Sequence, residues 1–403
     1  MRLVPLLLVV GATALAAQAK PRPRALGIPF NGTPGPLNAI TDVTGVEVGQ
    51  VTLIEGQGRL RVGRGPVRTG VTAIFPRGRR DGRPAMGAWW TLNGNGEMTG
   101  TTWLQESGFL WGPVLITNTL SVGVVRDAVI DWAVRRGYDD FLWALPVVAE
   151  TYDGGLNDIK GMHVTREHAF QALDAAKGGP VAEGDVGGGT GMVCNGFKGG
   201  IGTSSRKLSV EAGGFTVGVL VQCNYGGRRR FSVAGVPVGA QITGADNCVA
   251  LPDPSEPWLR DEPRCGAPGR SDRESGRTEL GSIIVVLATD APLLPHQLQR
   301  LAKRVALGIG RLGGIGGDSS GDIFVAFSTA NAGAAAPDSA VTVQMWPNDR
   351  INPLLEATVD ATEEAIINAM AAAETMDGAD GYRVYALPMD QVVALLRRAG
   401  RIP

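Results

Sequence analysis

The chain has 403 residues and a formal net charge of −1, from 38 basic and 39 acidic side chains. This balance excludes a strong overall field that would attract nucleic acid or an anionic membrane. The 58 glycines are dispersed among apolar runs without a collagen period, so they indicate tight turns and close backbone contacts. The length is sufficient for a large core, and the sequence contains no internal repeat.

The first 19 residues have the pattern of an export signal. Arg2 supplies a positive start, residues 3–15 form a short apolar core, and Ala17-Gln18-Ala19 has the small-x-small form of a cleavage site. The apolar core is too short for a comfortable transmembrane helix. The sequence therefore predicts a signal peptide over residues 1–19 and a periplasmic or secreted mature protein that begins near Lys20.

Apolar periodicity predicts a mixed succession of strands and helices after this leader. Alternating positions with glycine breaks, typical of half-buried strands, run through residues 38–54 and 60–76. Further strands are predicted at 142–149, 216–221, 282–289, 323–327, 341–346 and 382–387, and helices at 121–137, 167–177, 295–307, from Asn352 onward and at 391–398. Because hairpins occur within this mixed order, a sheet-on-sheet core covered by helices fits better than a doubly wound parallel sheet. No linker clearly divides the chain into domains.

The four cysteines contain no CxxC pair, which argues against a zinc ribbon. Cys248 and Cys265 flank a Pro-rich loop, and an oxidising compartment would allow them to form a disulfide. Cys194 and Cys223 lie in apolar, glycine-containing segments, which are typical of buried free thiols.

The junction between Gly281 and Ser282 is the strongest local signal for chemistry. A polar, Gly- and Pro-rich stretch over about 253–277 precedes it, and Ser282 opens the apolar run 282–288. A cut at this bond would make Ser282 an N-terminal residue, whose free amine can act as the base for its own hydroxyl. The alternative is an ordinary junction between a loop and a strand.

Other familiar motifs are weak. His163 and His168 are five residues apart, which is the wrong spacing for two metal ligands on one helical face. A GxGxxG match at 308–313 follows a predicted helix, whereas a dinucleotide fingerprint begins one, so it indicates a helix end. His163, His168 and His296 are interpreted as structural or surface residues, and the cluster Arg228-Arg229-Arg230 as a solvated turn.

Several polar residues lie at the ends of apolar runs. Each alone is compatible with a turn or a cap. Together they are the types that a hydrolytic serine needs, namely an amide to stabilise an oxyanion, a hydroxyl relay, and acids to hold an amine. They are Asn93, Asn95, Glu150, Tyr152, Asn224, Ser320 and Asp322.

Long stretches of the chain resemble the self-processing, DmpA-like serine aminopeptidases, which include L-aminopeptidase/D-amidase-esterases and β-peptidyl aminopeptidases. The matching runs are spread over most of the mature chain, and their order and spacing are specific. They lie at 35–49, 145–154, 179–192, 197–206, 221–226 and 288–298.

The resemblance implies an α+β fold, a four-layer αββα sandwich with an N-terminal nucleophile, as in DmpA and ornithine acetyltransferase. It also implies an inactive precursor that cuts itself into an α-chain (20–281) and a β-chain (282–403), which form one folded unit and assemble into a homo-oligomer. The implied activity removes N-terminal β-amino acids, or small D- or L-residues, from short peptides, amides and esters. The implied chemistry needs no metal or organic cofactor, and the implied partners include neither nucleic acid nor membrane.

Carried over residue by residue, the resemblance makes Ser282 the nucleophile and Gly281 the residue ahead of the cut. Ser320 and Asp322 match the hydroxyl and the acid that assist the nucleophile, where some members have Glu in place of Asp. Asn224 matches the amide of the oxyanion hole.

Two further residues match the substrate-binding positions. Glu150 corresponds to the carboxylate that holds the free ammonium of the substrate, and Tyr152 to a tyrosine that lines the site in some members. Two alternative functions stay open at this point: an acyltransferase on the same fold, and an exported peptide-binding protein.

Overall fold

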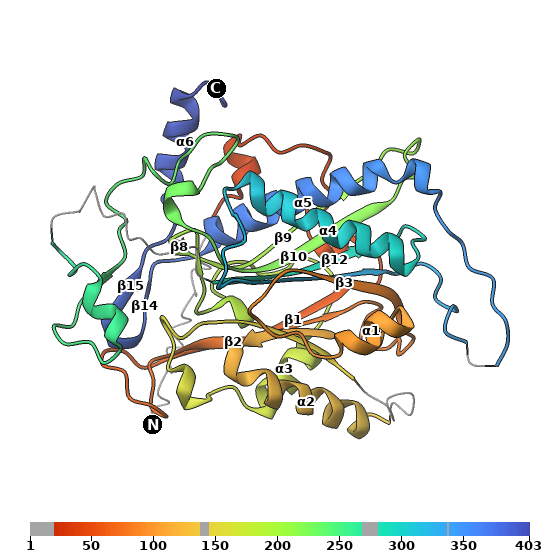
Figure 1. Ribbon diagram of the computed structural model, residues 1–403, viewed down its shortest axis with the longest axis horizontal. Coiled ribbons are helices and arrows are strands. Elements are labelled where there is room, and N and C mark those ends of the chain that lie inside the picture. Colours follow the sequence, from red (N-terminus) through yellow and green to blue (C-terminus); the bar gives the residue numbers. More distant parts are fainter. Residues whose placement is uncertain (1–19, 138–144, 268–280, 337) are drawn as a thin grey trace, which may run out of the picture.

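The computed structural model describes residues 20–137, 145–267, 281–336 and 338–403 (Figure 1). The predicted signal peptide, residues 142–144 of a predicted strand, and residues 268–277 of the polar stretch before Ser282 lie outside the described residues. Within the described ranges, no helix combines the length and the apolar character needed to cross a membrane.

A six-stranded sheet forms one half of the core. Its order is β4 (Phe109–Leu110), β3 (Ala85–Gly94), β13 (Gly321–Ser328), β12 (Ser282–Thr289), β10 (Thr216–Asn224) and β9 (Gly200–Lys207). β12 and β13 are parallel, and every other neighbouring pair is antiparallel. β12 thus lies inside the sheet with a strand on each side. Its residues are buried on both faces of the sheet, which explains why its sequence is apolar at nearly every position.

A four-stranded sheet forms the other half. Its order is β1 (Glu47–Glu55), β2 (Val67–Phe75), β5 (Val114–Asn118) and β6 (Val147–Thr151), with only β5 and β6 parallel. The two sheets pack face to face. Side chains of β5 and β6 share a buried cluster with Leu220, Ile284 and Val325 of the larger sheet.

Helices cover both outer faces (Figure 1). α4 (Pro295–Arg311) and α5 (Asn352–Ala372) pack on the six-stranded sheet, and α2 (Val122–Arg135) and α3 (Arg166–Ala175) pack on the four-stranded sheet. The alternation along β12 fits this arrangement, since Ile283 contacts the helix-side cluster and Ile284 the cluster between the sheets. The predicted αββα sandwich is confirmed.

The remaining elements lie at the periphery. They are α1 (Thr101–Ser107), α6 (Met389–Arg398), a three-stranded sheet of β11 (Cys248–Val249), β15 (Tyr382–Val384) and β14 (Met376–Asp377), and a hairpin of β7 (Val193–Cys194) and β8 (Phe197–Lys198). The strand predicted at 341–346 was wrong, because this alternating segment is a non-regular, largely exposed loop. Asn331 hydrogen-bonds to the backbone N and O of Gln344, and Trp346 N donates to the carbonyl oxygen of Pro292.

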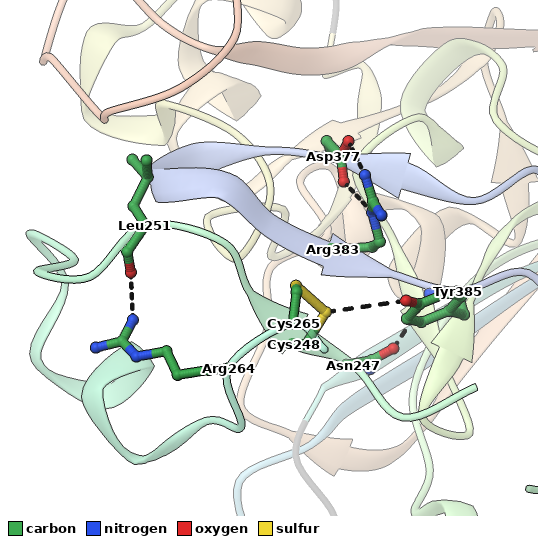
Figure 2. The surroundings of a disulfide bond; sticks show 8 residues. All are labelled: Asn247, Cys248, Leu251, Arg264, Cys265, Asp377, Arg383 and Tyr385. Carbon is green, nitrogen blue, oxygen red and sulfur yellow. Dashed lines mark hydrogen bonds and ion pairs between the residues drawn. A yellow bond between two sulfur atoms is a disulfide. The ribbon is translucent and has the colours of Figure 1, made fainter. Parts of the chain in front are cut away.

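Both cysteine pairs form disulfides. The predicted pair, Cys248 and Cys265, has an S–S distance of 2.10 Å and closes a peripheral loop beside Tyr385 and Asn247 (Figure 2). The interpretation of Cys194 and Cys223 as free thiols was wrong, since they are joined to each other. β7 lies beside the end of β10, which brings their Cα atoms to 5.6 Å although 29 residues separate them. Their predicted burial is confirmed.

A buried acid links the four-stranded sheet to the loop after β6. Asp153 is fully buried, and Thr69, Asn118 and Asn157 surround its carboxyl group. Asn157 Nδ2 donates a 3.0 Å hydrogen bond to Asp153 Oδ1. Burial raises the pKa of Asp153 to about 7. The hydrogen bonds with these three neighbours lower the pKa and only partly offset the effect of burial.

Replacing Asp153 by Asn is therefore expected to change how the free energy of unfolding depends on pH. The wild-type carboxyl has a pKa of about 3.9 in the unfolded chain and about 7 in the folded protein. Its contribution to stability is complete below about pH 4 and is lost as the pH rises towards 7. The stability of Asp153→Asn relative to wild type should rise across that window, by at most about 1.4 kcal/mol per pH unit.

Urea denaturation at intervals from pH 4 to pH 8 measures this difference. Asp349→Asn, at an exposed position, controls for the removal of a carboxylate as such. A difference between Asp153→Asn and wild type that does not change with pH contradicts the prediction.

Candidate active site

Two strand pairings fix the position of Ser282. It is the first residue of β12 and lies opposite Asn224, the last residue of antiparallel β10, and opposite Gly321, the first residue of parallel β13. Alternation along β12 and β10 places Ser282 on the side of Ile284 and Asn224 on the side of Leu220, where both apolar side chains face the four-stranded sheet. The candidate nucleophile and the candidate oxyanion amide therefore meet at one edge of the space between the sheets.

The backbone of the residue ahead of Ser282 strongly favours glycine. Gly281 has a φ of +119°, and a Cβ atom there would lie 1.9 Å from the backbone oxygen of Asn224. No side chain fits so close to a neighbouring strand. At the predicted cleavage junction, backbone geometry thus determines the residue type at Gly281, whereas strand register determines the position of Ser282.

The backbone N–H of Gly321 points at this junction. It donates to the carbonyl oxygen of Gly281 at 3.3 Å and to Ser282 Oγ at 3.2 Å. The same donor thus contacts the carbonyl group of the Gly281–Ser282 bond and the hydroxyl that would attack it. Sequence analysis missed this donor, because a glycine N–H has no residue-type signature.

Ser320 and Asp322 flank Gly321 and contact each other. Ser320 Oγ donates a 2.7 Å hydrogen bond to Asp322 Oδ1, and both side chains are fully buried. Asn93 Nδ2 and Asn95 Nδ2 donate to the carbonyl oxygens of Gly317 and Ser319, which hold the loop before Ser320. The two asparagines therefore support the loop.

The side chain of Asn224 is held in one orientation. Its Oδ1 accepts from the N–H of Val193 at 2.8 Å, and its Nδ2 donates to the carbonyl oxygen of Tyr152 at 3.0 Å. An amide nitrogen carries two hydrogens, so one N–H bond of Asn224 has no acceptor among the described residues and can donate to a further group. The arrangement suits a fixed donor that does not reorganise when an oxyanion forms.

Glu150 is a buried carboxylate close to this edge. Only 3% of the residue is exposed, its Oε1 accepts from the N–H of Glu97 at 3.0 Å, and its Oε2 accepts from Thr119 Oγ1. A Cβ atom on Gly96 would lie 3.2 Å from both Glu150 Oε1 and the Cα of Gly321. This shared neighbour places the carboxylate near the start of β13 and hence near Ser282.

The electrostatics of Glu150 favour a cationic ligand. Within the described part of the chain, no Lys or Arg forms an ion pair with it. Burial raises the pKa of Glu150, and the two hydrogen bonds oppose this only partly. An ammonium group bound here would stabilise the ionised carboxylate.

Tyr152 contributes to the site through its backbone. Its carbonyl oxygen holds Asn224, as described above, whereas its side chain is half-exposed and lines a small cavity with Leu60, Val62 and Glu256. Burial, together with the nearby charge of Glu256, raises the pKa of the Tyr152 hydroxyl. Its predicted contact with substrate stays a prediction.

The residues interpreted as structural have structural contacts. His163 Nε2 contacts Asp158 Oδ2 at 2.9 Å, and His168 caps the first turn of α3 through Thr165. The GxGxxG match spans the C-terminal end of α4, where Gly308 allows α4 to approach Thr362 of α5. None of these residues takes part in the site around Ser282.

Comparisons with known proteins agree with this geometry. Residues 38–384 match the model of peptidase family S58. The chain is 52% identical over 398 residues to the β-peptidyl aminopeptidase BapA of Sphingosinicella microcystinivorans, which covers 98% of this chain and 96% of that protein.

Two solved structures have a similar fold. The L-aminopeptidase D-Ala-esterase/amidase of Ochrobactrum anthropi, a prototype serine aminopeptidase with a variant of the Ntn hydrolase fold, matches with a TM-score of 0.83 and 46% identity over 95% of this chain and 100% of that one. A β-aminopeptidase from Burkholderia sp. matches with a TM-score of 0.79 and 46% identity over the same shares. Because the family model covers most of the sequence and the relatives align along nearly its full length, this chain belongs to peptidase family S58.

Proposed function

We propose that this peptidase is a self-processing serine aminopeptidase that removes the N-terminal residue from short peptides, amides and esters. The observation that carries the proposal is the junction at Gly281–Ser282, where one N–H contacts both the carbonyl oxygen and the hydroxyl. β-Amino acids and small D- or L-residues are the proposed N-terminal residues, in line with the names of the relatives.

The first reaction is cleavage of the chain by itself. Ser282 Oγ attacks the carbonyl carbon of Gly281, the Gly321 N–H stabilises the oxyanion, and the Ser282 nitrogen leaves with a proton. Ser320, hydrogen-bonded to Asp322, is the proposed relay for the hydroxyl proton. Water then hydrolyses the resulting ester, which frees the carboxylate of Gly281 and the amine of Ser282.

The freed amine is the proposed base for turnover. An unperturbed α-amine has a pKa of about 7.7–8.0, so a useful fraction is unprotonated at neutral pH. It takes the hydroxyl proton as Ser282 Oγ attacks the substrate and returns it to the leaving amine. The second N–H of Asn224 stabilises the oxyanion, a role typically worth about 3 kcal/mol. Water then hydrolyses the acyl-enzyme through the same groups.

Glu150 is the proposed receptor for the substrate ammonium. Its buried carboxylate lies near the start of β13 and forms no ion pair with a Lys or Arg among the described residues, so a free amino end offers the missing charge. Tyr152 is the second proposed substrate-binding residue and lines the site beside Glu150. This restricts cleavage to the first residue, because an internal peptide bond has no ammonium at the required distance.

We further propose that export removes residues 1–19, that self-cleavage gives chains of residues 20–281 and 282–403, and that the two-chain units form homo-oligomers. The leader pattern and the family resemblance support these steps.

Replacing Ser282 by Ala is expected to prevent both self-cleavage and turnover, because both reactions need Oγ as the nucleophile. The purified wild type should give two polypeptides on a denaturing gel, one of which begins at Ser282 by N-terminal sequencing. Ser339→Ala, in an exposed loop, should be processed like wild type. Cleavage of the Ser282→Ala chain at this bond would remove Ser282 from its role.

Replacing Glu150 by Gln keeps the shape of the side chain and removes its charge. We expect kcat/KM on free-amine substrates to fall by about 100-fold, in the range of about 2–3 kcal/mol for a lost buried charge pair. Self-cleavage and folding should be retained, because neither needs the substrate ammonium.

Steady-state kinetics with a free and an N-acetylated substrate check the role of Glu150. The wild type should not turn over the acetylated form, and Glu106→Gln, at an exposed glutamate, should behave like wild type. Rapid hydrolysis of the acetylated substrate, or unchanged kinetics of Glu150→Gln, would exclude Glu150 as the ammonium receptor.

A further inference from the structure

The loop between β1 and β2, residues 56–66, has a two-sided sequence that the reaction described above does not use. Arg59, Leu60, Arg61 and Val62 alternate basic and apolar side chains, and Arg64 follows one glycine later. The structure preserves the alternation. Leu60 and Val62 line the small cavity beside Tyr152, whereas the three arginines line a different hollow.

Buried carboxylates hold this loop in place. Asp158 Oδ2 accepts from the N–H of Gly63 at 2.7 Å and of Gly65 at 3.1 Å. Asp380 Oδ1 accepts from the N–H of Leu60 at 2.9 Å. Both acids are at most 1% exposed. The arginines thus extend from a backbone whose position is held by hydrogen bonds to buried carboxylates.

The arginine side of the loop forms a hollow of about 280 Å³. Arg59, Arg61 and Arg64 line it together with glycine, glutamine and proline, and none of the described residues that line it is acidic. Arg59 Nη1 donates to the carbonyl oxygen of Asp253 at 2.7 Å. Within the described ranges, none of the three guanidinium groups forms an ion pair with Asp or Glu. Such a hollow suits an anion, and guanidinium groups bind carboxylates with two parallel hydrogen bonds.

The apolar side of the same loop lies beside Tyr152, next to the candidate active site. Leu60 and Val62 share their cavity with Tyr152, whose carbonyl oxygen holds the Asn224 amide opposite Ser282. Glu150, two residues before Tyr152, is the proposed receptor for the amino end of the substrate. A peptide with its amino end at Glu150 and its scissile bond at Ser282 has its carboxyl end on the leaving-group side.

We infer that residues 56–66 form the leaving-group subsite, in which Arg59, Arg61 and Arg64 attract the C-terminal carboxylate of the peptide and Leu60 and Val62 contact its side chains. The inference rests on the proposed aminopeptidase function and adds a substrate class to it, namely peptides with a free carboxyl end. We expect the arginines to bind the carboxylate equally in the substrate and in the transition state, so that its loss raises KM and leaves kcat unchanged.

Matched substrates test this subsite. Each pair has the same sequence with a free amino end and differs only in a C-terminal carboxylate or carboxamide. Peptides of two to six residues are needed, because each extended residue adds about 3.3–3.6 Å. The peptide length at which the carboxylate has the largest effect reports the distance from Ser282 to the arginines. We expect the wild-type ratio of kcat/KM, acid over amide, to reach about tenfold at the best length, equivalent to about 1.4 kcal/mol, and to fall with added salt.

The triple variant Arg59→Gln, Arg61→Gln, Arg64→Gln should reduce this ratio to about one, through KM, without changing the kinetics of the amide substrates. The matched control removes three exposed charges near the C-terminus, as Arg397→Gln, Arg398→Gln, Arg401→Gln, and should keep the wild-type ratio. Self-cleavage of the triple variant and its unchanged activity on amides show that it folds.

The outcomes separate the subsite from the function it rests on. A wild-type ratio near one at every length, or a ratio that the triple variant retains, overturns the subsite while the aminopeptidase stands. Failure of the wild type to hydrolyse either member of any pair rejects the proposed function instead.

Inorganic phosphate is the competing anion, and it should inhibit hydrolysis of the acids and not of the amides. Equal inhibition of both, lost in the triple variant, would assign the hollow to a free anion and overturn the carboxylate subsite.

Discussion

The site depends on the pairing of β12 between β10 and β13. The antiparallel register brings the end of β10 to Ser282, and the parallel register brings the start of β13 to the same point. An amide side chain, a hydroxyl and a backbone N–H therefore meet at one sheet edge although they come from three separate parts of the chain. A slip of one residue would turn Ser282 towards α4 and α5 and separate it from Asn224.

The same edge concentrates polar groups that are costly to bury. Glu150 is ionisable, almost completely buried and, among the residues that the structure describes, without a Lys or Arg as an ion-pair partner. Asp153, three residues later, has a pKa raised to about 7. Their hydrogen-bond donors come from adjacent positions, since Thr119 contacts Glu150 and Asn118 lies beside Asp153. The end of β5 thus organises both acids. In the proposed function, the substrate ammonium offsets the cost of burying one of them.

Backbone geometry has as large a part in the site as side-chain chemistry. Glycine is strongly favoured at Gly281 because its φ is positive and a neighbouring strand leaves no space for a Cβ atom, and Gly321 contributes only its N–H. The proposed leaving-group subsite follows the same rule, since Asp158 and Asp380 bind backbone N–H groups of the loop whose side chains face the ligand. In each case a fixed main chain presents the reactive or binding group.

The sequence by itself determined the elements with strong local signals: the apolar run after Ser282, the amphipathic helix that became α4, and the glycine-serine junction. Its resemblance to a family of aminopeptidases also named the residues that meet at the sheet edge. Predictions from local sequence were wrong where contacts with residues distant in the sequence decide the structure. Residues 341–346 alternate like a strand, but they form a loop that hydrogen-bonds to Asn331 and Pro292, and Cys194 met Cys223 only because β7 lies beside β10. Only the tertiary structure decided the two roles of Gly321 N–H, because a backbone donor carries no residue-type signal and its contacts depend on the register between distant strands.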